Sequence, residues 1–306
     1  MKKIFIIIIF LLGITFAQEV TISHGKLSID GLLWLTYQYT KDTIVSNTFN
    51  RRAAFLGLSS KLTEQISARI YIDIANMSAY DIYIMYKTHS KVSFLFGQFK
   101  LPLGIEVLTK PQQLELIQYS LIGRDPIRTP KGTRDIGIQT SLAFPFIDLT
   151  LALVNGNGRN TYDDDNKKCL ASRLLIKPLN TANIFIGANY FGGQYNNSQQ
   201  KFSKLGLELN YTVKPIIFKA EFLSNDDALK GSGYYFQLGY NWLWLQPIFR
   251  YSAFKIQNQD RLDEYTFGLN LCSLSDNLKI LINYKFEKIS LNNKQSGILT
   301  QVQFAF

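Results

Sequence analysis

The feature that most constrains the fold is the alternation of apolar and polar side chains, which is plainest in the last ten residues. One face of this strand carries Ile298, Thr300, Val302, Phe304 and Phe306, and the other carries Leu299, Gln301, Gln303 and Ala305. A soluble domain seldom ends on such a strand, because its bare edge would pair with other chains. A barrel closed within a membrane has no free edge, so the pattern favours that architecture.

The first seventeen residues have the layout of a secretory signal peptide. Lys2 and Lys3 precede an unbroken apolar run from Ile4 to Leu12, and Ala17 follows at a suitable cleavage position. The apolar run is too short to span a bilayer, which takes about 20 residues. We therefore expect residues 1–17 to be removed on export. Since no linker or change of composition divides the rest, we expect residues 18–306 to form a single domain.

Alternation continues from Gly25 to the end of the chain, in segments of about the 9–11 residues that cross a bilayer at a tilt. Sixteen such segments are expected near residues 25–40, 50–62, 64–75, 80–89, 91–100, 134–144, 146–155, 169–177, 182–191, 202–213, 215–224, 233–242, 244–254, 263–273, 276–287 and 296–306. Short turns alternate with longer polar loops along this series, as in outer-membrane barrels.

These observations predict an all-β fold, a transmembrane antiparallel up-and-down β-barrel of about sixteen strands. Aromatic residues gather near both ends of the segments, as they do at membrane interfaces. A ring of that width is too wide for side chains to fill, so it leaves an aqueous channel. The last strand must pair with the first to close the ring, and we expect Phe306 to be an assembly signal.

Residues 101–133 form a connection without strand alternation, and so long a loop in a compact barrel calls for a functional reason. Its middle, Gln112 to Ile122, is compatible with a short helical turn, and its end is basic. We expect this constriction loop to fold into the lumen.

The segment Gly97-Gln-Phe-Lys-Leu-Pro-Leu-Gly-Ile-Glu106 resembles the G-x-F-K-x-P-x-G-x-E signature of the phosphate-selective porin O and P family. Stretches at Arg51–Ser59, Gly132–Gly137 and Leu153–Gly156 are similar to further parts of the family pattern. The resemblance implies a sixteen-stranded channel in the bacterial outer membrane, assembled as a homotrimer, with its third loop turned inward. The family's selectivity residues cannot be placed one by one on this chain.

The formal net charge of +10 falls to +8 when the two lysines of residues 1–17 are removed. Side chains expected to face the lumen or to lie on the long loop carry a surplus of five positive charges, and basic rings favour anions in a pore. This predicts a mild preference for small anions, with phosphate and polyphosphate as candidates, among other small solutes. The candidate anion-binding residues are Arg124, Arg128, Lys131, Arg134, Arg69, Arg250, Arg173 and Lys110.

Other functional classes find less support in the sequence. Two histidines give no set of nucleophile, base and orienting group for a hydrolase. Cys169 and Cys272 form no metal-binding pair, and the acidic stretch 163–165 lacks the spacing of a calcium loop, so neither a metal nor a cofactor is expected. No nucleic-acid partner is expected. A plugged or structural barrel, and a soluble secreted β-protein, remain alternatives to the channel.

Overall fold

The computed structural model of the protein describes residues 19–22, 25–41, 47–89, 91–124, 127–129, 131–163, 165–195, 200–227, 230–272, 277–288 and 294–306. The signal peptide expected at residues 1–17 lies outside this part of the chain. In the described ranges, no helix is both long enough and apolar enough to cross a membrane.

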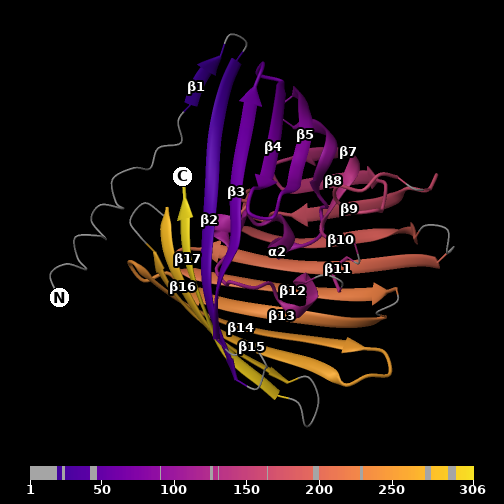
Figure 1. Ribbon diagram of the computed structural model, residues 1–306. Coiled ribbons are helices and arrows are strands. Elements are labelled where there is room, and N and C mark those ends of the chain that lie inside the picture. Colours follow the sequence, from indigo (N-terminus) through magenta and orange to yellow (C-terminus); the bar gives the residue numbers. More distant parts are fainter. Residues whose placement is uncertain are drawn as a thin grey trace.

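Sixteen strands, β2 to β17, form one closed ring in which each strand pairs antiparallel with the next (Figure 1). β17 pairs with β2, which closes the ring as expected from the sequence. The strands are β2 (Gly25–Lys41), β3 (Asn47–Lys61), β4 (Ile66–Asp73), β5 (Ser78–His89), β6 (Val92–Lys100), β7 (Arg134–Ala143), β8 (Ile147–Val154), β9 (Cys169–Ile176), β10 (Ile184–Tyr195), β11 (Gln200–Val213), β12 (Ile216–Asp226), β13 (Gly231–Tyr240), β14 (Leu245–Ile256), β15 (Arg261–Cys272), β16 (Leu278–Lys288) and β17 (Lys294–Ala305).

The prediction of an all-β barrel with sixteen strands is confirmed, and most observed strand ends lie within two or three residues of the expected ones. One further strand was not expected. β1 (Glu19–Ile22) pairs antiparallel with the start of β2, where Glu19 lies opposite Ser28. It extends one rim of the barrel at that point, and the number of strands around the barrel stays sixteen.

The two faces of the barrel follow from the period of two. Along β13, Tyr234, Phe236 and Leu238 are at least 38% exposed, whereas Tyr235 and Gln237 are at most 3% exposed. The exposed residues form an apolar outer wall suited to lipid, and the buried ones point to the inside of the ring. The aromatic residues expected at the strand ends, among them Phe144, Tyr240 and Trp244, are also exposed on this outer wall.

Three register shifts break the alternation in the described strands, one of them between Lys87 and His89 near the end of β5, and the other two matter for the lumen. The register of β2 with β3 shifts between Trp34 and Leu35, which leaves Arg52 as the extra residue. The register of β4 with β5 shifts between Tyr71 and Ile72, which leaves Tyr80 as the extra residue. Bulges redirect side chains and are frequent beside functional sites. Both Arg52 and Tyr80 line the same internal cavity, so the bulges turn them into the lumen.

The C-terminal residue is fastened to the first strand of the ring. The backbone N–H of Gly31 donates to the carbonyl of Phe306 (2.9 Å), and the N–H of Phe306 donates to the carbonyl of Gly31 (3.0 Å). The Phe306 ring lies so close to Gly31 that a Cβ there would come within 2.2 Å of it. Gly31 thus makes room for the terminal ring at the seam where the barrel closes.

We expect deletion of Phe306 to lower the yield of assembled barrel. The deletion removes two backbone hydrogen bonds of about 1 kcal/mol each from the closing seam, together with the packing of the ring on Gly31. The measurement is the fraction of folded protein on an unheated detergent gel after refolding. Leu243→Ala, a change at an exposed turn residue, is the control. Equal folded fractions for the deletion and the control would show that Phe306 is not an assembly signal.

Candidate pore and its anchored loop

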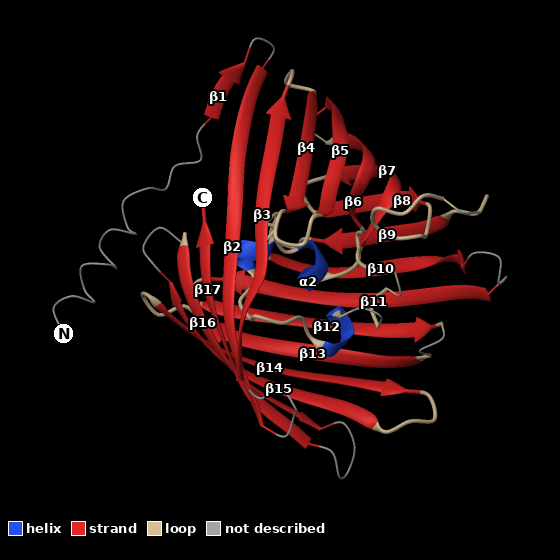
Figure 2. Cartoon of the chain, in the orientation of Figure 1, coloured by secondary structure: helices blue, strands red, loops and turns tan. Residues whose placement is uncertain are grey.

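Residues 101–133 contain three short helical turns rather than one central helix. These are α2 (Ile105–Leu108), η1 (Pro111–Gln113) and η2 (Leu121–Gly123), and they lie within the ring of strands (Figure 2). Pro111 cannot continue a helix begun before it, because it lacks the N–H that an interior position needs. The helical turn expected between Gln112 and Ile122 is therefore found only at the two ends of that stretch.

Polar groups on the inner wall bind the backbone of this loop. The N–H of Ile105 donates to Glu221 of β12 (2.9 Å), that of Ile117 to Asn283 of β16 (2.8 Å), and that of Leu121 to Ser252 of β14 (2.9 Å). In return, the amide of Gln303 on β17 donates to the carbonyl of Gln112 (2.9 Å). These bonds satisfy backbone groups that burial would otherwise leave unpaired at a cost of about 1–3 kcal/mol each.

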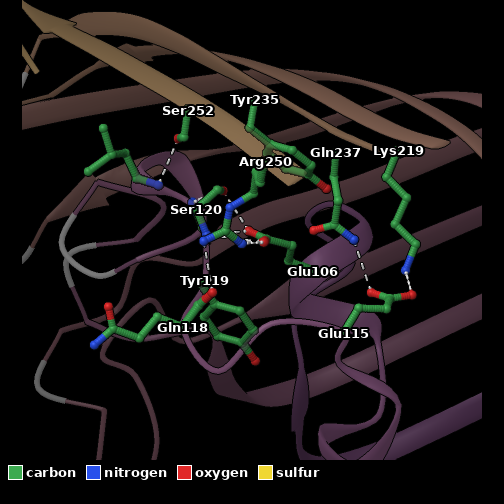
Figure 3. Close-up of polar contacts among 12 residues, drawn as sticks. Glu106, Glu115, Gln118, Tyr119, Ser120, Lys219, Tyr235, Gln237, Arg250 and Ser252 are labelled. Carbon is green, nitrogen blue, oxygen red and sulfur yellow. Dashed lines mark hydrogen bonds and ion pairs between the residues drawn. The ribbon is translucent and has the colours of Figure 1, made fainter. Parts of the chain in front are cut away.

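Ion pairs anchor the same loop to the same wall (Figure 3). Glu106 accepts a hydrogen bond from Arg250 of β14 (2.8 Å) and another from the Ser120 hydroxyl within the loop (2.6 Å). Glu115 pairs with Lys219 of β12 and accepts a bond from Gln237 of β13 (3.2 Å). Both carboxylates of the described loop residues therefore meet a cation on the wall.

Cations of the loop meet carboxylates of the wall in the same way. Arg128 pairs with Glu221 (2.7 Å), and Arg124 pairs with Glu264 and with Glu287 (3.1 Å). Burial lowers the pKa of Arg124, but Glu264 and Glu287 raise it more, so its pKa lies above the usual range and the guanidinium stays charged. Lys285, which pairs with Glu287 (2.9 Å), brings the anchoring cluster to five cations and five carboxylates, so the cluster is neutral as a whole although its members are charged.

Apolar side chains complete the contact between loop and wall. Leu121 and Ile122 pack against Leu223, Tyr235 and Phe254 of strands β12, β13 and β14. In a separate cluster, Ile117 packs against Leu281 of β16 and Leu299 of β17. The middle and end of the loop thus rest on strands β12 to β17, whereas its start, with Leu101, Leu103 and Ile105, packs against β8 to β11.

The anchoring contacts change the interpretation of three candidate anion-binding residues. Arg128 and Arg250 are each 1% exposed, and Arg124, whose side chain is 28% exposed, is held between two carboxylates, so all three fasten the loop. The period of two placed Arg250 on the inner face correctly, but the pattern gives no sign of the carboxylates that approach from the loop. We assign these three arginines to positioning the loop.

The open space lies on the other side of the loop, against strands β2 to β8. One cavity of about 500 Å³ includes Asn76, Lys131 and Arg159 from connections on the long-loop side, so it is the outer chamber. A second cavity of about 580 Å³ includes Ser59 and Ser67 near a short turn, so it is the inner chamber. Both chambers are lined by Lys100, Pro111 and Arg134, which therefore stand where the two meet. A smaller cavity of about 250 Å³ adjoins Lys100 and reaches Arg173.

Basic residues outnumber acidic ones along these cavities. The eight basic residues are Arg52, Arg69, Lys100, Lys110, Lys131, Arg134, Arg159 and Arg173, and the three acidic residues are Asp30, Asp73 and Asp81. Arg173 also pairs with Glu208, which does not line the cavities, so the local surplus is reduced from five to four. Five of the predicted residues, Arg69, Lys110, Lys131, Arg134 and Arg173, thus line the open space.

Aromatic rings, rather than carboxylates, hold several of these cations. The guanidinium of Arg52 lies 5.0 Å from the ring centroid of Trp34, and that of Arg159 lies 4.2 Å from the ring centroid of Tyr80. Arg134 lies over the same Tyr80 ring at 4.6 Å and also pairs with Asp81 (2.6 Å). A ring attracts a cation without cancelling its charge. Across the described residues, no carboxylate pairs with Arg52, Lys100, Lys110, Lys131 or Arg159.

Three cavity residues, Arg52, Lys100 and Arg159, were not expected to line the pore. Lys100 follows Gln98 at a spacing of two, so the alternation along β6 contained the signal. Arg52 sits at a bulge, where the alternation fails, and Arg159 lies in a loop, where no alternation exists.

A comparison with known families decides what the ring and its inner loop belong to. Residues 29–215, more than half of the chain, match the sequence model described as phosphate-selective porin O and P. The chain belongs to the phosphate-selective porin O and P family. The porin is therefore a channel of the bacterial outer membrane, as the resemblance had implied. No curated protein sequence matches it.

Solved structures share the fold of the porin. An OmpF of Salmonella typhi, in complex with daunomycin, has a TM-score of 0.74 at 12% identity, with 94% of this chain and 100% of that chain covered. An anion-selective porin from Comamonas acidovorans has a TM-score of 0.67 at 10% identity, with 92% and 99% covered. OmpT of Vibrio cholerae in its trimer form has a TM-score of 0.67 at 8% identity, with 93% and 100% covered.

Proposed function

We propose that the porin is a passive diffusion channel with a preference for small anions, and that residues 101–133 act as its constriction loop. The observation that carries this proposal is the uneven distribution of paired charges. Cations on strands β11 to β17 are largely neutralised by the loop they anchor, whereas five of the eight cations that line the cavities on the other side pair with no carboxylate among the described residues. Low-dielectric walls focus such a field and concentrate counter-ions in the pore.

The single acidic residue of the outer chamber weakens the field only slightly. Asp73 is 1% exposed and accepts hydrogen bonds from the N–H groups of Ala54 (3.2 Å) and Ala75 (3.0 Å) and from the amide of Asn76 (2.6 Å). Three donors therefore already disperse its charge before a solute arrives. Burial raises the pKa of the Tyr119 phenol to about 12, so this ring enters the chamber uncharged at neutral pH.

The reversal potential across a planar bilayer with a potassium chloride gradient tests the proposal. We expect a potential of the sign that indicates chloride permeating faster than potassium, and a smaller potential at high salt, because screening shortens the reach of fixed charges. A potential of the opposite sign would overturn the anion preference. A bilayer that shows no current steps would overturn the channel itself and favour a plugged barrel.

We also propose that the porin assembles as a homotrimer and carries no enzymatic activity. The trimer form of the Vibrio cholerae barrel, which has the same fold, supports the first part, and membership of a porin family supports the second. Sedimentation in detergent of matched density tests the oligomeric state, with a monomer mass as the contrary result. Hydrolysis of general ester and peptide substrates by the purified protein would contradict the second part.

A further inference from the structure

We propose that the outer chamber is a binding site for organic anions that combine a flat aromatic ring with two acidic groups. This inference rests on the proposed anion channel and names the class of solute that the channel selects. The site consists of the Tyr80 ring, with Arg52, Lys131 and Arg159 around it. The argument depends on the size of the chamber, the surface of its wall and the rigidity with which its cations are held.

The size of the chamber favours an organic solute. Its volume of about 500 Å³ falls within the range of about 300–1000 Å³ that is usual for sites that hold drug-sized molecules. A single inorganic phosphate would fill only a small part of this space and would reach few of the cations at once. A larger anion with two separated acidic groups can contact two of the cations that line the chamber at once.

The wall of the chamber is aromatic as well as basic. Trp34, Phe55, Tyr80 and Tyr119 line it, beside the aliphatic residues Ala53, Pro111 and Leu114. Phe55 contacts Trp34 edge-on with centroids 5.8 Å apart and Tyr80 edge-on at 5.0 Å, which fixes the orientation of the set. Aromatic pairs contribute about 0.5–1.5 kcal/mol beyond the area they bury, so a flat ring gains more here than an aliphatic body.

Arg159 is held in place by the residue that follows it. The N–H of Asn160 donates to the Gln98 side chain (2.6 Å), and its amide donates to the carbonyl of Ala79 (3.0 Å). Asn160 has a φ of 58°, a left-handed conformation that asparagine tolerates better than most residues. Asn160 is therefore a positioning residue, which clamps the loop so that Arg159 stays over Tyr80.

Lys131 is brought to the same place by a close approach of two backbones. Gly158 has a φ of 81°, and a Cβ at this position would come within 2.2 Å of the carbonyl oxygen of Lys131. Only glycine fits this contact without strain. The end of the constriction loop and the tip of the next loop are thereby packed together, with Lys131 and Arg159 at one side of the chamber and Arg52 on β3.

Block of the chloride current by two matched dianions tests the inference. Terephthalate is planar and aromatic, whereas its saturated trans-cyclohexane analogue carries the same two carboxylates at a similar separation without a flat ring. We expect terephthalate to reach half-block at a concentration about fivefold lower than the saturated analogue, and both to block at lower concentrations than inorganic phosphate. Equal potency of the two dianions would overturn the aromatic site while leaving the anion channel intact.

Variants separate the parts of the site. Arg159→Gln removes one cation from a loop and should weaken block by both dianions, whereas Tyr80→Leu should remove the advantage of terephthalate over the saturated analogue. Asn160→Ala keeps the charge of Arg159 but loosens the loop that positions it. It should therefore also weaken the block by both dianions. Arg261→Gln, the same change outside the chamber, is the matched control. If Arg159→Gln behaves like this control, the site is wrong. A reversal potential that indicates cation preference in the wild type would instead overturn the proposed function.

Discussion

Glu221→Ala is expected to release the constriction loop and to enlarge the single-channel conductance. The carboxylate is fully buried and accepts hydrogen bonds from the N–H groups of Ile105 (2.9 Å) and Glu106 (3.1 Å), from the Tyr235 hydroxyl (2.8 Å) and from Arg128 (2.7 Å). Its removal leaves Arg128 as a buried charge without a partner, which costs about 3–5 kcal/mol. This free-energy cost destabilises the state in which the loop is bound to the wall, so the loop should detach.

Single-channel recordings measure this effect directly. We expect larger and noisier current steps from Glu221→Ala than from the wild type. The double variant Glu221→Gln with Arg128→Met keeps an acceptor for the two N–H groups and leaves no buried charge, so it should restore most of the wild-type conductance. Glu208→Ala removes another buried carboxylate, one that binds Arg173 of the wall and not the loop, and should leave the step size nearly unchanged. Enlarged steps in all three variants would contradict the anchoring role.

Lys100→Glu is expected to weaken the anion preference strongly, because it lowers the positive surplus along the cavities from four charges to two. Lys100 lines all three cavities on the open side of the loop, and its ammonium donates a hydrogen bond to the carbonyl of Thr109 (2.8 Å), which holds it beside the junction of the two chambers. A unit charge at about 4 Å is worth about 1 kcal/mol even in bulk water. The substitution changes the charge by two units, which gives about 2 kcal/mol and more than a tenfold change in anion occupancy.

The permeability ratio of chloride to potassium, from reversal potentials, measures the change. Lys100→Met removes the charge without reversing it and should fall between the wild type and Lys100→Glu. Lys255→Glu makes the same reversal at an exposed site that lines none of the cavities, and it should leave the ratio close to that of the wild type. If Lys255→Glu and Lys100→Glu shift the ratio equally, the total charge of the protein sets selectivity and the junction does not.

The alternation predicted the ring well because a membrane barrel obeys a single rule along its whole length. Each strand must put apolar residues toward lipid, so the period of two is enforced wherever the strand is regular, as along Tyr234, Phe236 and Leu238 of β13. The rule fails at Arg52, because a bulge inserts one residue and shifts the faces. A register shift of this kind leaves no mark in the residue types around it.

The charge count was harder to interpret than the strand count. Lys219 and Glu221 lie two residues apart on one face of β12, a spacing that from sequence alone suggests that they pair with each other. In the structure, Lys219 instead pairs with Glu115 and Glu221 pairs with Arg128, both from the loop. Lys285 and Glu287 do pair with each other (2.9 Å). Alternation tells which face a residue occupies, but it does not tell which segment comes across the lumen to meet it.

Because the loop is anchored mainly to one side of the ring, the two halves of the ring have different functions. Strands β11 to β17 supply the ion pairs that hold the loop, and strands β2 to β9 line the open space. Apart from Lys100, which donates a hydrogen bond to the loop, a substitution on the half that lines the open space therefore leaves these ion pairs intact. Such a barrel can acquire a new solute in small mutational steps, each tolerated by the fold, while the half that holds the loop stays as it is.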